Sequence, residues 1–176
     1  MNVPIVRERQ RNEINDRVIS NEKLIEMTDI IMVDTCSLLH TGFWGFMIGA
    51  SAQLKATGRK IFVLYSAVRE LEKLSLSDSY ELREKSRRAM GLISHMLQYH
   101  VLAVTGDAED PRINDVQIIE YVMRYRGSKR IAVITQDYQL AKDLQTINRL
   151  RSYSGNSVQL YKLNSDNRLY RRIIMD

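Results

Sequence analysis

The sequence predicts an α/β protein built on a mainly parallel sheet with helices on both of its faces. Short runs of branched apolar residues recur along the chain, as expected for strands that are buried on both sides. Segments with apolar residues at helical spacing separate these runs. This alternation is typical of parallel sheets, because each crossover between parallel strands needs a long connection that is usually a helix.

The first half of the chain contains two expected strands. Residues 30–34 form the first, and the stretch rich in glycine and aromatic residues that follows it is expected to begin a helix reached through a turn. A helix is expected over residues 51–58, where Gly58 is suited to the C-cap. Residues 61–65 form the second strand, and residues 66–74 read as the helix that follows it.

The second half continues the same alternation. A long amphipathic helix is expected within residues 75–98, and a third strand at 100–105. After a polar loop, residues 115–125 read as a helix and residues 131–135 as a fourth strand. The remaining expected elements are a helix from residue 136, a fifth strand at 157–164 and a basic C-terminal piece at 167–174.

Length and composition favour one compact domain with an extension before it. The 176 residues can bury a core without cross-links, and 44% of them are apolar. Residues 1–29 carry many charged side chains with apolar residues at helical spacing, so we expect a partly helical extension there. Residues 30–176 are expected to form the domain itself.

The composition excludes several classes of protein. The single cysteine, Cys36, allows neither an intramolecular disulfide nor a zinc site built from several thiolates. No apolar stretch reaches the ~18–20 residues of a membrane span, and residues 1–13 are too charged for a signal peptide core. We therefore expect a cytoplasmic protein with no membrane partner. The net charge of +5 favours polyanionic partners.

Four carboxylates stand where strands or loops pass into helices. They are Asp34, Glu70, Asp115 and Asp137. The carboxyl ends of parallel strands meet at one edge of a sheet, where ligands bind. Clustered carboxylates raise one another's pKa values, so a cluster costs stability unless a cation neutralises it. We therefore expect a site for Mg²⁺ or Mn²⁺, because hard cations prefer oxygen ligands.

Each acid taken alone has a simpler interpretation. Asp34, Asp115 and Asp137 stand where aspartate often caps a helix. Glu70 lies near a helix start, where a carboxylate complements the helix dipole. These structural roles remain open beside the metal site.

The most economical chemistry for clustered carboxylates is metal-assisted cleavage of a phosphodiester. Three hydroxyl residues, Thr35, Ser37 and Thr135, stand next to the acids. Their hydroxyls are suited to orient waters, carboxylates or phosphate oxygens in this site. Helix capping and turn hydrogen bonds are the alternative roles of these residues.

The motifs DTCSLL, AVREL, NDVQII and ITQD together resemble those of the PIN-domain nucleases over roughly residues 30–164. The matching positions are Asp34 with Thr35, Glu70, Asp115, and Asp137 with Thr135. The resemblance implies a three-layer α/β/α sandwich, dependence on Mg²⁺ or Mn²⁺, and hydrolysis of single-stranded or structured RNA. It also implies a homodimer, or an antitoxin or other protein partner, since several members are dimers and many are toxins.

The chain departs from the family pattern at three places. Cys36 stands where serine or asparagine is common, and Gln136 replaces a frequent asparagine. Residues 1–29 form a longer leading segment than the small toxins usually carry. The last departure weakens the toxin role more than it weakens the fold.

Basic side chains surround the turn at residues 126–130. Arg124, Arg126, Lys129 and Arg130 are expected to bind nucleic acid, because phosphate contacts dominate such affinity. Arginines and tyrosines also alternate in the C-terminal quarter, which suits single-stranded RNA through phosphate pairing and base stacking. For any one of these residues, a solvated surface role is equally open.

Two competing functions remain beside the metal-dependent ribonuclease. One is a noncatalytic PIN-like module that binds RNA or a protein partner and keeps its acids as helix caps. The other is a phosphohydrolase of the haloacid dehalogenase type, which is disfavoured because DTC at residues 34–36 lacks the second aspartate of that chemistry. The presence of all four expected acids favours the ribonuclease.

Overall fold

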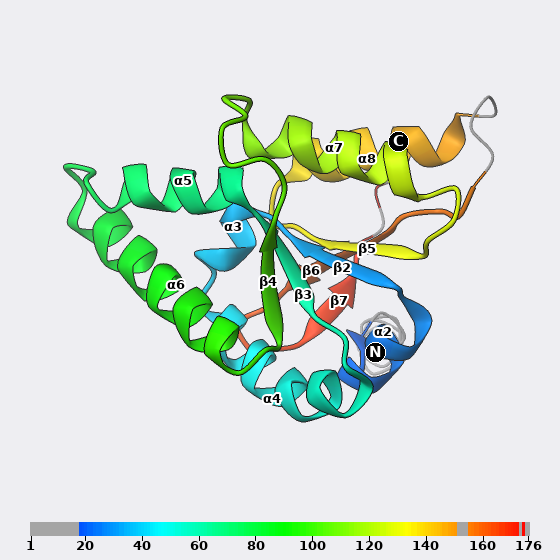
Figure 1. Ribbon diagram of the computed structural model, residues 1–176, viewed down its shortest axis with the longest axis horizontal. Helices are drawn as coiled ribbons and strands as arrows, with labels where there is room; N and C mark the ends of the chain where they lie inside the picture. Colours follow the sequence, from blue (N-terminus) through cyan, green and yellow to red (C-terminus); the bar gives the residue numbers. More distant parts are fainter. Residues whose placement is uncertain (1–17, 151–154, 173, 175–176) are drawn as a thin grey trace, which may run out of the picture.

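The computed structural model describes residues 18–150, 155–172 and 174 (Figure 1). Its centre is a seven-stranded sheet in the order β1-β7-β6-β5-β2-β3-β4. The strands are β1 (Val18–Ile19), β2 (Ile30–Val33), β3 (Ile61–Leu64), β4 (Leu102–Thr105), β5 (Ile131–Ile134), β6 (Gln159–Leu163) and β7 (Leu169–Arg171). Strands β6, β5, β2, β3 and β4 run parallel. On one side of them, β7 pairs antiparallel with β6, and β1 pairs antiparallel with β7. The predicted α/β class with a mainly parallel sheet is confirmed.

Helices cover both faces of this sheet. They are α2 (Asn21–Met27), α3 (Thr35–Leu38), α4 (Gly42–Thr57), α5 (Tyr65–Leu74), α6 (Tyr80–Gln98), α7 (Asn114–Tyr125) and α8 (Tyr138–Arg149). Figure 1 shows α7 and α8 together on one side of the sheet, with α4 and α6 on the other. None of these described helices has the length and apolar character needed to cross a membrane.

Two apolar cores follow from the alternation of side chains along each strand. In β2, Ile31 and Val33 pack into the core that contains the buried residues of α2, α4, α5 and α6. The intervening residues, Ile30 and Met32, pack into the core formed with α7 and α8. Because both faces are covered, the central strands read as continuous apolar runs rather than as alternating ones.

Residues 42–57 form one helix, which joins the helix start expected in the stretch rich in glycine and aromatic residues to the segment predicted at 51–58. The predicted C-cap is present, because Gly58 has a φ of 67° and its N–H donates to carbonyl oxygens of the last helical turn. Gly42 and Gly45 lie against Asn164 and Asn167, where a Cβ atom would collide. Glycine at these two positions therefore permits close packing of the helix.

The two ends of the described chain pair with each other. Val18 of β1 lies opposite Tyr170 of β7, and β7 lies within the piece expected only to be basic. Leu24 and Ile25 of α2 are buried in the core. Residues 18–29 of the expected extension thus contribute a strand and core contacts. Residues 1–17 lie outside the described part of the chain.

Candidate active site

Asp34 follows β2 and begins α3, and its carboxylate is almost fully buried. Its Oδ1 accepts a hydrogen bond from the backbone N–H of Ser37 at 2.7 Å, so it does cap the helix. Its Oδ2 accepts from the hydroxyl of Thr135. Burial raises the pKa of Asp34 above its ordinary value, although these hydrogen bonds partly oppose the shift. A capping role alone therefore does not account for its burial.

Glu70 lies in the second turn of α5 and is exposed to solvent. Its Oε2 accepts a hydrogen bond from the hydroxyl of Thr35 at 2.6 Å. Thr35 directly follows Asp34, so this contact holds the Glu70 carboxylate beside the start of α3. The hydroxyl of Ser37 has a different role, because it donates to the carbonyl oxygen of Ile134 and ties α3 to β5.

Asp137 caps α8 at the end of β5. Its Oδ1 accepts from the N–H of Leu140 at 2.9 Å. Its own N–H donates to the hydroxyl oxygen of Thr135 at 3.0 Å, and the same hydroxyl donates to Asp34. The fully buried Thr135 therefore joins two of the acids through a single side chain.

Asp115 lies in the first turn of α7 and is half-buried. The helix is capped at Ile113 without a side-chain hydrogen bond, so Asp115 does not play the capping role considered for it. The pKa of Asp115 rises to about 6, chiefly through burial and then through the negative charges of Asp137, Asp34 and Glu70. The structure thus brings all four acids within electrostatic reach of one another.

The four acids also affect the pKa of the Cys36 thiol. Its pKa rises to about 11 through partial burial of the thiol, followed by the charges of Asp34, Asp137, Glu70 and Asp115. The residue as a whole is exposed. A thiol with a raised pKa is a poor nucleophile near neutral pH, so Cys36 is no candidate for covalent catalysis.

A buried pair of side chains that the motif analysis missed joins the helices bearing Glu70 and Asp115. The Ser66 hydroxyl donates to Asn114 Oδ1 at 3.0 Å. Ser66 lies one helical turn before Glu70, and Asn114 directly precedes Asp115. The Asn114 Nδ2 is buried without a hydrogen-bond partner among the described residues. An unmatched donor of this kind is costly unless a ligand or water accepts from it.

A cavity of about 470 Å³ opens beside this pair. Glu70, Asp115 and Asn114 line it together with the basic residues Arg69, Lys73 and Arg112. Arg69 donates to the carbonyl oxygens of Ala108 and Asp110, and Arg112 pairs with Asp110 and Glu120. Lys73 has no ion-pair partner within the described part of the chain, so its charge is available to an anion.

Arg172 is a second residue that the sequence did not assign to this site. Its Nη1 donates to the carbonyl oxygen of Thr135 at 2.9 Å, and its guanidinium lies 5.7 Å from the ring centre of Tyr138. Burial lowers the pKa of Arg172, while Asp137 and Asp34 act in the opposite direction. The C-terminal pattern of arginines and tyrosines includes Arg172, but its contact with Thr135, 37 residues away, is non-local, so the pattern does not place Arg172 beside the acids.

The basic turn expected to bind nucleic acid lies at the opposite edge of the sheet. It leads into the start of β5, where Ile131 pairs with Ile30, whereas Asp34 follows the other end of β2. Arg126 is only 4% exposed and donates to the carbonyl oxygen of Ile147, so the expectation that it binds nucleic acid is wrong.

The neighbours of Arg126 are exposed, but two of them are already paired. Arg124 forms an ion pair with Glu120 at 3.2 Å, and Arg130 forms one with Asp29 at 2.9 Å. Lys129 is exposed. The basic residues that do lie near the acids are Arg69, Lys73, Arg112 and Arg172.

The acids fit a hard divalent cation in their chemistry, since all four offer carboxylate oxygens. Burial and then the negative charges of Asp137, Asp34 and Glu70 raise the pKa of Asp115, and a cation would neutralise these charges. Within residues 18–150, 155–172 and 174, however, no three acidic, histidine or cysteine side chains are arranged to hold a metal ion. Coordination therefore requires side-chain rotation, such as release of Glu70 from Thr35.

No family model matches the chain, and no curated protein matches it.

Proposed function

We propose that this chain is a ribonuclease of PIN type with a three-layer α/β/α fold, which uses Mg²⁺ or Mn²⁺ bound by Asp34, Glu70, Asp115 and Asp137. One observation carries the proposal. Four acids from separate segments meet at the carboxyl edge of the sheet, and burial, followed by the charges of the other three acids, raises the pKa of Asp115 to about 6. Proteins keep such costly clusters of charge chiefly at functional sites.

The bound cation would supply an activated water and neutralise charge on the phosphate. Thr135 and the Ser37 N–H hold the Asp34 carboxylate in one orientation, and Thr35 positions Glu70 beside it. Asp34 is only 1% exposed, so bulk water is almost wholly excluded from its carboxylate. The fixed placement of Asp34 fits the demand of catalysis for preorganised charge, whereas Glu70 would leave Thr35 to reach a cation.

The basic residues near the acids support a polyanionic substrate. Lys73 lines the cavity that Glu70 and Asp115 share, and Arg172 lies within electrostatic reach of Asp34 and Asp137. The unmatched Nδ2 of Asn114 is available to donate to a phosphate oxygen or to a water. We assign the phosphate-binding role to these residues rather than to the turn at 126–130.

A noncatalytic PIN-like module that binds RNA or a protein partner is the second candidate. The observation that favours it is that the Asp34 and Asp137 carboxylates already serve as helix caps. In that case the acids would be retained for stability alone. Binding of RNA without metal-dependent cleavage is its expected signature.

The decisive test is cleavage of a mixed single-stranded RNA pool in Mg²⁺, Mn²⁺ or EDTA. We expect metal-dependent cleavage by the wild type and a loss of about a thousandfold in Asp34→Asn, equivalent to about 4 kcal/mol of transition-state stabilisation. Asp78→Asn is the matched control, because Asp78 is exposed in the turn before α6. A folded wild type that cleaves in neither metal would favour the noncatalytic module.

A further inference from the structure

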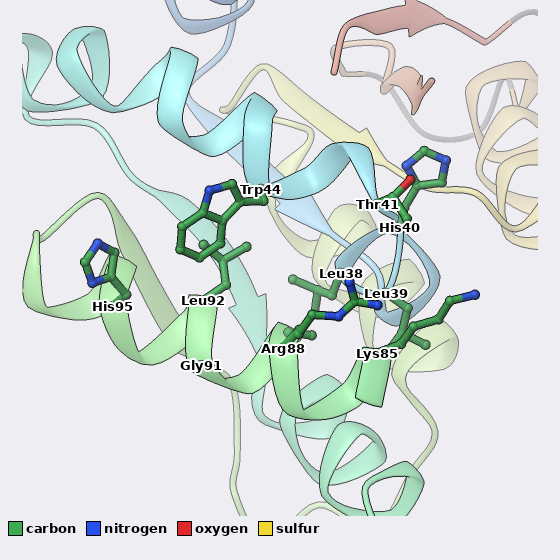
Figure 2. A pocket seen from close by; sticks show the side chains of 11 residues that line it. Leu38, Leu39, His40, Thr41, Trp44, Lys85, Arg88, Gly91, Leu92 and His95 are labelled. Atoms are coloured by element: carbon green, nitrogen blue, oxygen red, sulfur yellow. The ribbon is translucent and has the colours of Figure 1, made fainter. Parts of the chain in front are cut away.

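A second cavity, of about 500 Å³, opens between the α3–α4 turn and α6 (Figure 2). Its volume lies within the range of small-molecule sites, which is about 300–1,000 Å³. Leu38, Ala89 and Leu92 are each 3% exposed and form an apolar floor. Leu38 ends the four-residue helix α3, so the cavity begins roughly 6 Å along that helix from Asp34.

One wall of this cavity is aromatic and unusually open to solvent. Trp44 is 48% exposed and stacks on His95, with ring centres 6.1 Å apart and planes inclined by 22°. His95 in turn contacts Tyr99, which is 48% exposed and carries the Lys55 ammonium 4.4 Å above its ring. Aromatic faces that are held in place but not covered are suited to stack on a planar ligand.

The other wall is cationic. Lys85 and Arg88 line the cavity from consecutive turns of α6, and Figure 2 shows Arg88 extending toward Leu38 and Leu39. Lys85 is paired with Glu81 on the same helix. Arg88 is exposed and forms no ion pair within the described residues, unlike its neighbour Arg87, which pairs with Glu84 at 3.3 Å. The cavity is thus lined both by a free guanidinium and by an open indole ring.

We propose that this cavity binds one nucleotide of single-stranded RNA, with the base against Trp44 and the phosphate against Arg88. A planar apolar group joined to an anion matches a cavity that is lined both by exposed aromatic rings and by a cation. The inference rests on the proposed function and deepens it, since the cavity would hold the substrate about one helical turn from Asp34. A peptide helix would need a long apolar groove rather than a cavity edged by unpaired positive charge.

Trp44 is the only tryptophan in the 176 residues, so its fluorescence reports on this cavity alone. We would titrate the Asp34→Asn variant, without added metal, with short polyuridylate, polyadenylate and the same chain lacking its bases. We expect saturable quenching of Trp44 by the two complete oligomers and much weaker quenching by the abasic chain. Equal quenching by the abasic chain, or no change with any oligomer, would overturn the proposal.

Free uridine and adenosine monophosphates and inorganic phosphate distinguish the other sources of this ligand chemistry. We expect each to bind much more weakly than the oligomers, because only a strand also contacts the basic residues near the acids. Mononucleotide binding as tight as that of the oligomers would assign the cavity to a free nucleotide and overturn the RNA assignment.

Substitutions then separate stacking from charge, with labelled RNA and fluorescence anisotropy as the readout. Trp44→Leu should weaken binding roughly 5- to 150-fold, the contribution of stacking one base, whereas Trp44→Phe should weaken it less. Arg88→Gln should lower the slope of log K against log salt by about 0.7, as for one lost phosphate contact. The matched control Arg87→Gln should change the slope much less, and equal effects of the two arginines would contradict a specific contact.

The outcomes for binding and for cleavage are independent. Quenching of Trp44 by RNA without cleavage by the wild type would retain the nucleotide site and reject the ribonuclease. Cleavage that is unaffected by Trp44→Leu and Arg88→Gln at subsaturating RNA would retain the ribonuclease and reject the nucleotide site.

Discussion

The two edges of the sheet treat their carboxylates in opposite ways. At the amino edge, Asp29 forms hydrogen bonds and an ion pair with Arg130, and this contact holds the pKa of Asp29 well below its usual range. At the carboxyl edge, none of the four clustered acids forms an ion pair within the described residues, and the pKa of Asp115 rises. Arg130 thus neutralises the acid at the amino edge. The acids at the carboxyl edge have no such partner in the described part of the chain, as the proposed cation site requires.

The largest expected difference between the edges is stabilisation by divalent cations. At a concentration a hundred times the dissociation constant, Mg²⁺ or Mn²⁺ should add about 2.7 kcal/mol to the free energy of unfolding. Thermal unfolding at neutral pH with EDTA or with excess Mg²⁺ measures this effect. Asp115→Asn should reduce the shift strongly and Asp29→Asn should preserve it. Equal shifts in both variants would mean that the cation binds elsewhere.

The pH dependence of the metal-free protein should also come from the carboxyl edge. The pKa of Asp115 is raised from 3.8 to about 6, so its folded form holds the proton more tightly than its unfolded form. The free energy of unfolding should therefore increase as the pH falls from 7 toward 5, because this stabilisation requires the protonated carboxyl. A shift of that size corresponds to at most about 3 kcal/mol, and screening by solvent reduces it to about 1 kcal/mol.

Urea denaturation in EDTA at several pH values measures this dependence. Asp115→Asn should be less sensitive to pH between 5 and 7, because it carries no titrating group at that position. Asp29 contributes in the opposite direction, since its lowered pKa means that stability is lost only at more acidic pH. A wild type whose stability falls between pH 7 and 5 would contradict the charge excess at the carboxyl edge.

Ser66→Ala should lower the stability of the carboxyl edge by removing a hydrogen bond that joins the helices bearing Glu70 and Asp115, without changing any charge. The substitution leaves the buried Asn114 Oδ1 without its donor, at an expected cost of about 1–2 kcal/mol in the free energy of unfolding. If Ser66 positions Glu70 and Asp115, kcat should fall while the Michaelis constant changes little. Ser75→Ala, which removes a hydroxyl that contacts only Glu72, should cost less than about 0.5 kcal/mol.

The smallest effect is expected at the amino edge. Asp29→Asn removes an ion pair whose side chains are 31% and 47% exposed, so it should cost about 0.2–1 kcal/mol in the free energy of unfolding. Cleavage by this variant should be unchanged in rate. A large loss of activity would mean that the two edges are coupled through β2 or β5.

The residues of the central strands could be predicted from the sequence because burial on both faces imposes a local signature. The runs at 30–34, 61–65 and 131–135 each lie within one residue of the observed strands β2, β3 and β5. The third strand begins later than predicted, at Leu102, because His100 adopts a φ of 58° where the chain leaves α6. Strand β1 is two residues long and has no periodicity that a sequence can display.

The sequence by itself determined the strand runs and the position of one acid after β2 and another after β5, because a parallel topology brings the carboxyl ends of strands to one edge. Only the tertiary structure decided that Arg126 is buried, that Ser66 meets Asn114, and that Arg172 reaches Thr135. The open stack of Trp44 on His95 belongs to this second group. Each of these contacts joins residues far apart in the chain, so no local pattern of apolar or charged side chains encodes it.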